Sequence, residues 1–78
     1  MKRPKKITKY IIVGERGCFT GKTYKGTYDY TYAECGDKDE ALRFPTLEAA
    51  REKRAEISRG IYGLGKTHIE KVEELELL

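Results

Sequence analysis

The first part of the chain has the hydrophobic pattern of β-strands. Residues 7–14 (ITKYIIVG) contain an apolar run from Tyr10 to Val13 with no polar side, which predicts a central strand covered on both faces. Residues 18–24 and 27–35 alternate Tyr and Thr with small or charged residues, and Lys25-Gly26 stands between them. Because glycine at the second turn position accommodates a positive φ, this pattern predicts a β-hairpin with a two-residue turn.

A two-residue turn fixes the register of this hairpin. It places Lys22 opposite Asp29 and Thr20 opposite Thr31, which are favourable cross-strand pairs. Alternate residues share a face, so one face collects Phe19, Gly21, Tyr28, Tyr30 and Tyr32. The other face collects Thr20, Lys22, Tyr24, Asp29 and Thr31. We expect Gly21 to leave room for the Tyr30 ring, and Phe19 and at least two of the first face's three tyrosines to be buried against a helix.

Residues 47–59 have the spacing of an amphipathic helix. Thr46 is a typical N-cap, and Asp37 with Glu40 has the capping pattern of one helical turn before it. Arg54 interrupts the apolar stripe, so we expect its guanidinium to reach a carboxylate, a tyrosine hydroxyl or backbone carbonyls near a sheet edge. The apolar stripe consists of Leu47, Ala50, Ile57 and Ile61, and the opposite, acidic ridge consists of Glu48, Glu52 and Glu56.

The last segment, residues 67–73, allows two interpretations. Thr67 and Glu70 have the spacing of a capping box at the start of a helix, whereas a strand would extend the sheet and cover Ile11 and Val13. We favour the strand. The chain is then one α+β domain over residues 1–78, with the order β-β-β-α-β: a small antiparallel sheet of three to four strands with one helix packed on one face. Residues 1–6 form a basic N-terminal arm, and residues 74–78 form a short acidic and apolar tail.

Residues 14–23 (GERGCFTGKT) end like a phosphate-binding loop. That motif requires a glycine, four residues and then Gly-Lys-Ser/Thr, but Arg16 stands where the first glycine belongs. The loop must also open a helix, whose N-terminus binds phosphate, whereas TYKGTYDYTY follows here and is typical of strands. We therefore expect no nucleotide affinity at Gly21-Lys22-Thr23.

The charges are distributed unevenly. The chain has 16 Lys and Arg, 13 Asp and Glu and a net charge of +3. Residues 1–25 hold eight basic side chains and one acid, whereas residues 26–78 hold eight basic side chains and twelve acids. A basic arm of this kind attracts polyanions, but charged termini also keep small proteins soluble. Both interpretations stay open.

The sequence has little of the chemistry of an enzyme. It contains no nucleophile–base set, and His68 is the only histidine. Cys18 and Cys35 form no C-x-x-C motif, so we expect neither a metal nor a cofactor. The absence of an apolar run of about 18 residues and of a secretory signal predicts a cytoplasmic protein without a membrane partner.

The stretch DKDEALRFPTLEAA, between the aromatic hairpin and the helix, resembles one in short phage and prophage accessory proteins. The shared pattern is Asp-x-x-x-Ala-x-x-Phe-x-Thr-x-x-x-Ala, flanked by an apolar Tyr-Ile-Ile strand and a closing Ile-Glu-Lys-Val. The resemblance covers residues 8–73. It implies a β-β-β-α-β fold and a role in binding and inhibiting a host protein in the host cytosol, as anti-CRISPR proteins do.

Two functions follow from these patterns. The first is a small non-enzymatic protein that binds and modulates or inhibits a host macromolecule. The alternative is a nucleic-acid-binding module, in which sheet tyrosines stack on bases and N-terminal lysines hold phosphates. The candidate contact residues are Lys2, Arg3, Lys5, Lys6, Lys9, Lys22, Tyr24, Lys25, Glu48, Glu52, Arg54 and Glu56.

Overall fold

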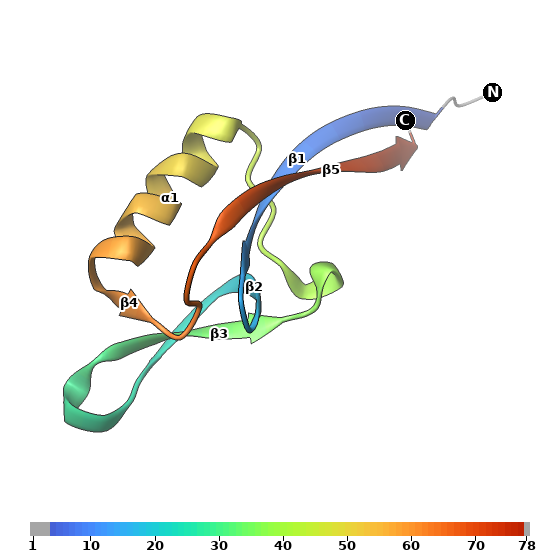
Figure 1. Cartoon of the computed structure of the whole chain (residues 1–78). Helices are drawn as coiled ribbons and strands as arrows, with labels where there is room; N and C mark the ends of the chain where they lie inside the picture. The colour runs from blue at the N-terminus through green and yellow to red at the C-terminus, as the bar shows by residue number, and fades with distance from the viewer. Residues whose placement is uncertain (1–3, 78) are drawn as a thin grey trace.

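The computed structural model describes residues 4–77, which form an α+β fold with a curled sheet and a helix on one face of it (Figure 1). The predicted fold class is therefore confirmed. Among these residues the sheet has five strands in the order β4-β3-β2-β1-β5. The elements are β1 (Pro4–Gly14), β2 (Gly17–Lys25), the 3-10 turn η1 (Thr27–Asp29), β3 (Thr31–Gly36), the 3-10 turn η2 (Lys38–Glu40), α1 (Leu47–Gly60), β4 (Ile61–Tyr62) and β5 (His68–Leu77).

The sheet differs from the expected antiparallel sheet of three to four strands in one element. β4 begins directly after α1 and pairs parallel to β3, so the sheet is mixed. The other pairs, β1 with β2, β1 with β5 and β2 with β3, are antiparallel. β4 has only two residues, which is too short for a hydrophobic period to predict it.

The favoured strand at the end of the chain is confirmed. β5 pairs with all of β1 except Gly14, from Val13 opposite His68 to Pro4 opposite Leu77. It is therefore longer than the expected 67–73, and residues 4–6 and 74–77 are strand residues that lie beside each other. In Figure 1 this two-stranded ribbon extends past the helix on one side, and the β2–β3 hairpin extends on the other.

The strand β1 separates two hydrophobic clusters, as its apolar run predicts. Ile12 belongs to the main core between the sheet and α1, and Ile11 belongs to a smaller cluster with Cys18 and Ala41. Both isoleucines are fully buried. The remaining buried members of the main core are Phe19, Ala33, Phe44, Ala50, Ile57 and Leu64.

Both predicted helix starts are confirmed. Thr46 is the N-cap of α1, and its Oγ1 accepts a hydrogen bond of 3.1 Å from the Ala49 amide. The η2 turn has the predicted capping box, in which the Asp37 amide donates to Glu40 Oε1 at 3.3 Å.

The predicted hairpin register is wrong. Tyr24 lies opposite Tyr32, and the connection is the five-residue loop 26–30 instead of a two-residue turn. In this loop Tyr28 and Asp29 both adopt left-handed backbone angles, with φ of 59° and 62°. Asp29 therefore lies in the η1 turn and not opposite Lys22, and the pairing of Thr20 with Thr31 is wrong for the same reason.

A bulge in β2 also shifts the register. Phe19 pairs with Cys35 and Thr23 with Ala33, so three residues of β2 lie opposite one residue of β3. Gly21 adopts a φ of 92° within the bulge, and the Leu42 side chain lies against it. The room that was expected beside Gly21 for the Tyr30 ring is thus occupied by Leu42.

Candidate functional site

Four tyrosine rings form a continuous exposed row at the end of the β2–β3 hairpin. Tyr24, Tyr32 and Tyr62 are register partners on three neighbouring strands, β2, β3 and β4. Tyr24 and Tyr32 are stacked with ring centroids 5.7 Å apart, and Tyr32 and Tyr62 are 6.0 Å apart. Tyr30 meets Tyr62 edge-on at 5.3 Å. We call these four residues the tyrosine row.

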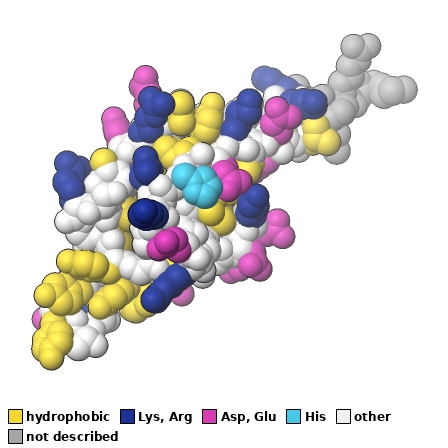
Figure 2. Space-filling model, in the orientation of Figure 1, with side chains coloured by type: hydrophobic (Ala, Val, Ile, Leu, Met, Phe, Trp, Pro, Cys, Tyr) yellow, Lys and Arg dark blue, Asp and Glu magenta, His cyan; other side chains and the backbone are white. Residues whose placement is uncertain are grey.

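The tyrosine row faces solvent instead of the helix. Tyr24, Tyr30 and Tyr62 are 54%, 50% and 53% exposed, and Tyr32 is half-buried. Figure 2 shows hydrophobic side chains gathered at this end of the molecule. Alternation along β3 explains the exposure, because Ala33 points into the main core and its neighbour Tyr32 points to the opposite face.

The expectation that two of the three hairpin tyrosines are buried is therefore wrong. Phe19 is buried at 2% exposure, as predicted, but Tyr28 is 87% exposed and Tyr30 is 50% exposed. The physical reason is the longer loop. It removes Tyr28 from the ladder and shifts Tyr30 to the loop end, so neither ring follows Phe19 into the core.

The loop that follows β2 holds the tyrosine row in place. The Gly26 amide donates to the Tyr30 carbonyl at 2.8 Å, and Lys25 Nζ donates to Thr31 Oγ1 at 3.1 Å. The Tyr32 ring packs directly over Gly26, where any side chain would collide with it. The loop backbone at Gly26 thus supports the Tyr32 ring.

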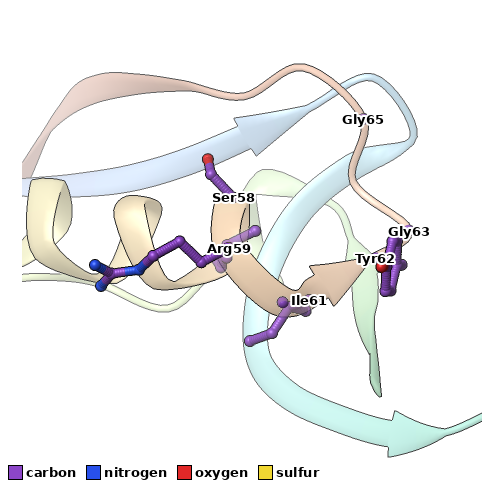
Figure 3. A pocket seen from close by; sticks show the side chains of 8 residues that line it. Ser58, Arg59, Ile61, Tyr62, Gly63 and Gly65 are labelled. Carbon is purple, nitrogen blue, oxygen red and sulfur yellow. The ribbon is translucent and has the colours of Figure 1, made fainter. Parts of the chain in front are cut away.

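Two hollows border the tyrosine row. One, of about 330 Å³, is lined by Tyr24, Tyr32 and the oppositely charged Arg16 and Glu34, among others. The second, of about 290 Å³, lies where α1 ends and includes Tyr62 (Figure 3). Arg59 also lines this hollow, but Figure 3 shows its side chain extending away from Tyr62.

The candidate lysines of the hairpin, Lys22 and Lys25, are partly offset by two acids, Asp29 and Glu34. Arg16, which lines the hollow beside Tyr24 and Tyr32, leaves an excess of one positive charge at this end. The Gly21-Lys22-Thr23 sequence lies within β2 and is followed by strand residues. This confirms the strand context that was expected for the motif.

The candidate lysines at the N-terminus lie in an acidic environment. Lys5 is a register partner of Glu76, and Lys6 Nζ lies 4.0 Å from Glu73 Oε2. Lys9 also lies in β1, opposite Val72 of β5. One ion pair, between Lys6 and Glu73, thus joins the two strands, whereas Glu70 and Glu74 of β5 pair with Lys38 and Arg43. The predicted contact residues Lys2 and Arg3 lie outside the described residues.

The acidic ridge of α1 is exposed and separate from the tyrosine row. Glu48, Glu52 and Glu56 all face solvent on the helix. Lys53 Nζ lies 2.8 Å from Glu56 Oε2, and this hydrogen bond lowers the pKa of Glu56. The described structure thus does not unite the predicted contact residues into one site.

Arg54 makes the contact that its position in the helix predicts. Its Nη2 donates to the Thr67 carbonyl oxygen at 2.7 Å, and its Nε lies 3.1 Å from the same oxygen and 3.0 Å from Thr67 Oγ1. Thr67 immediately precedes the edge strand β5. The guanidinium therefore ties α1 to the start of β5.

We expect Arg54→Leu to lower the free energy of unfolding by about 1 kcal/mol, because hydrogen bonds to Thr67 are lost from a partly solvated site. Arg54→Glu should cost roughly twice as much, since a carboxylate would face the Thr67 carbonyl oxygen. Urea unfolding of both variants measures the difference. Arg51→Leu, an exposed change on the same helix, is the control and should stay within about 0.5 kcal/mol of the native chain. If the two Arg54 variants lost the same free energy of unfolding, the hydrogen bonds from Arg54 to Thr67 would not stabilise the fold as described.

The sheet face that points away from α1 carries a small polar network beside the cluster of Ile11 and Cys18. His68 Nε2 lies 2.8 Å from Glu70 Oε2, and Lys38 Nζ lies 3.0 Å from Glu70 Oε1. The hydrogen bond with His68, followed by that with Lys38, lowers the pKa of Glu70. Burial raises the pKa of the Cys18 thiol, which is 4% exposed and belongs to this cluster.

Within residues 4–77, no group of three or more His, Cys, Asp or Glu side chains is arranged to hold a metal ion. In the same range, no helix is long and apolar enough to cross a membrane.

The sequence predicts only part of the tyrosine row. Tyr24 is among its candidate contact residues, Tyr30 and Tyr32 are expected in the core or, in the nucleic-acid alternative, on an exposed stacking face, and Tyr62 is not among the candidates. One feature of the sequence could have indicated Tyr62 as a contact residue: it is an aromatic residue between Ile61 and Gly63, directly after the apolar stripe of the helix. Comparisons of the chain with protein-family models, with curated proteins and with solved structures found no match.

Proposed function

We propose that this chain is a non-enzymatic binding module that contacts a partner protein through the tyrosine row. The observation that carries the proposal is the set of four rings in mutual contact, three of them about half exposed, on a sheet face that the helix leaves open. Tyrosine is enriched in the energetic centres of protein interfaces, since its large rigid ring loses little conformational entropy on binding.

The arrangement of the rings supports a protein partner over a nucleic acid. A base inserted between two rings needs about 7 Å between ring planes, twice the carbon–carbon contact distance of ~3.5 Å. The ring centroids of the tyrosine row are only 5.3–6.0 Å apart, so no base fits between neighbouring rings. The nucleic-acid alternative is thereby limited to bases that stack on the outer faces of the exposed rings.

The charges support the same choice. Nucleic-acid binding depends on excess basic residues that neutralise phosphates. The hairpin end has three basic side chains, Arg16, Lys22 and Lys25, and two acids, Asp29 and Glu34, which is an excess of only one positive charge. In β1, Lys6 is paired with Glu73 of β5. The likeness of DKDEALRFPTLEAA to phage accessory proteins extends the proposal to a host protein as the partner and inhibition as the effect.

An affinity experiment tests the proposal. Immobilised protein is incubated with lysate of the cell that makes it, with and without nuclease treatment, and the retained proteins are identified. We expect Tyr24→Ser and Tyr62→Ser each to reduce the recovered partner about tenfold or more, because loss of an aromatic hot spot costs about 2 kcal/mol. Tyr28→Asn is the matched control: it removes the more exposed ring of Tyr28, outside the tyrosine row, and asparagine tolerates its left-handed backbone.

Two outcomes would contradict the proposal. Recovery that is unchanged by both row variants would place the contact elsewhere on the molecule. Recovery that requires nucleic acid, and disappears after nuclease treatment, would favour the nucleic-acid-binding alternative. Thermal unfolding of each variant beforehand separates lost contacts from lost folding.

A further inference from the structure

The area of the tyrosine row limits what can bind to it. Three of its rings are about half exposed and the fourth less, so together they offer on the order of 400 Å², given 150–250 Å² for a whole aromatic side chain. A stable interface between two folded proteins needs roughly 800 Å² from each partner. The row alone is therefore too small for a stable contact with a second copy of this chain or with another folded domain, but it matches a short linear segment.

The row is also pre-organised to receive such a segment. Its three strand-borne rings stand on register partners, so they run straight across β2, β3 and β4. The Tyr32 ring packs on Gly26, and the loop is closed by the hydrogen bond from the Gly26 amide to the Tyr30 carbonyl. A rigid aromatic surface loses little entropy on binding, which favours a ligand that is itself already ordered.

From these properties we infer that the tyrosine row accepts a proline-rich segment of a partner protein in the polyproline II conformation. This inference rests on the proposed function. Polyproline II segments are pre-ordered and are recognised by aromatic-lined surfaces. Their backbone carbonyls have no internal partners, so they can accept hydrogen bonds from the exposed tyrosine hydroxyls.

The spacing of the rings indicates how the segment lies. The row has two outer ring pairs, Tyr24 with Tyr32 and Tyr30 with Tyr62, joined by the 6.0 Å contact between Tyr32 and Tyr62. The three centroid separations limit the distance between the centres of these pairs to about 11.5 Å, and one turn of polyproline II, three residues at 3.1 Å each, is about 9 Å and lies within that limit. Prolines separated by two residues, Pro-x-x-Pro, thus contact one ring pair each.

Two matched peptide libraries test this inference. One fixes two prolines three positions apart within randomised octapeptides, and the other has glycine at both fixed positions. We expect the full-length native protein to enrich the proline library at least tenfold over the glycine library. Tyr62→Ser should remove this preference, and so should Gly26→Ala, because the new methyl group displaces the Tyr32 ring without removing any tyrosine. Tyr28→Asn should retain it.

The outcomes separate this inference from the proposed function. Equal enrichment of the two libraries, or a proline preference that survives both Tyr62→Ser and Gly26→Ala, would overturn the inference. If the lysate partner still depends on Tyr24 and Tyr62 in that case, the proposed function stands and only the proline-rich ligand is wrong. If neither the partner nor the libraries depend on the row, both are wrong.

Discussion

Gly14→Ala is expected to lower the free energy of unfolding by about 3 kcal/mol, at the upper end of the cost of overpacking a core. A methyl group on Gly14 would lie 2.5 Å from the Leu64 carbonyl oxygen and 2.9 Å from Leu64 Cβ. Leu64 is 1% exposed and belongs to the main core, so it cannot move aside. Its carbonyl also accepts a hydrogen bond of 2.7 Å from the Glu15 amide, which fixes the backbone at this point.

The close approach of Leu64 to Gly14 joins the N-terminal strands to the segment that follows the helix. It brings the end of β1 against the loop between β4 and β5, and the Lys66 amide donates to Glu15 Oε2 beside it at 3.3 Å. A typical domain of 78 residues has roughly 4–12 kcal/mol of total stability. We therefore expect Gly14→Ala to lower the Tm, followed by circular dichroism, by roughly 12–24 °C.

Gly60→Ala is the matched control for this prediction. Gly60 is the last residue of α1, and a methyl group there would meet no atom within 4 Å. Because alanine forms helices more readily than glycine, we expect Gly60→Ala to raise the unfolding free energy by about 0.5–1 kcal/mol. A Gly14→Ala variant as stable as Gly60→Ala would show that the backbone contact with Leu64 is not tight.

The elements with local signals were predictable from the sequence. The apolar run in β1 indicated burial on both faces, and Thr46 indicated the start of α1, since each depends on near neighbours in the chain. The strand β5 was ambiguous locally and was favoured only because β1 needed a partner. Register depends on loop geometry, and nothing local distinguished a two-residue turn at Lys25-Gly26 from the five-residue loop that forms.

The candidate site was less predictable, because it depends on which strands become neighbours. Tyr62 joins the tyrosine row only because the two-residue β4 pairs with β3, about thirty residues earlier in the chain. The positions of the charges were also not predictable without knowing which strands pair. The lysines of β1 and the glutamates of β5 are far apart in the sequence, and pairing of the two strands brings them together.

The second large effect is expected at Phe19, which the sequence grouped with three tyrosines. The structure separates them: Phe19 is in the main core with Ile12, while Tyr28 is 87% exposed. Phe19→Ala should therefore cost about 3–5 kcal/mol, the range for deleting a buried aromatic ring. Tyr28→Asn should change the stability by less than about 0.5 kcal/mol, as exposed substitutions do.

Urea unfolding of Phe19→Ala, Phe19→Leu and Tyr28→Asn decides whether the core lies under α1 as described. Phe19→Leu keeps most of the buried volume and should cost about 1 kcal/mol, which separates the loss of volume from the loss of an aromatic ring. The backbone at Phe19 should persist in this variant, because its carbonyl oxygen accepts the Leu42 amide at 2.9 Å independently of the side chain. If Tyr28→Asn were as destabilising as Phe19→Ala, the Tyr28 ring would be part of the core. The hairpin would then have the two-residue turn, and the tyrosine row would not exist as an exposed surface.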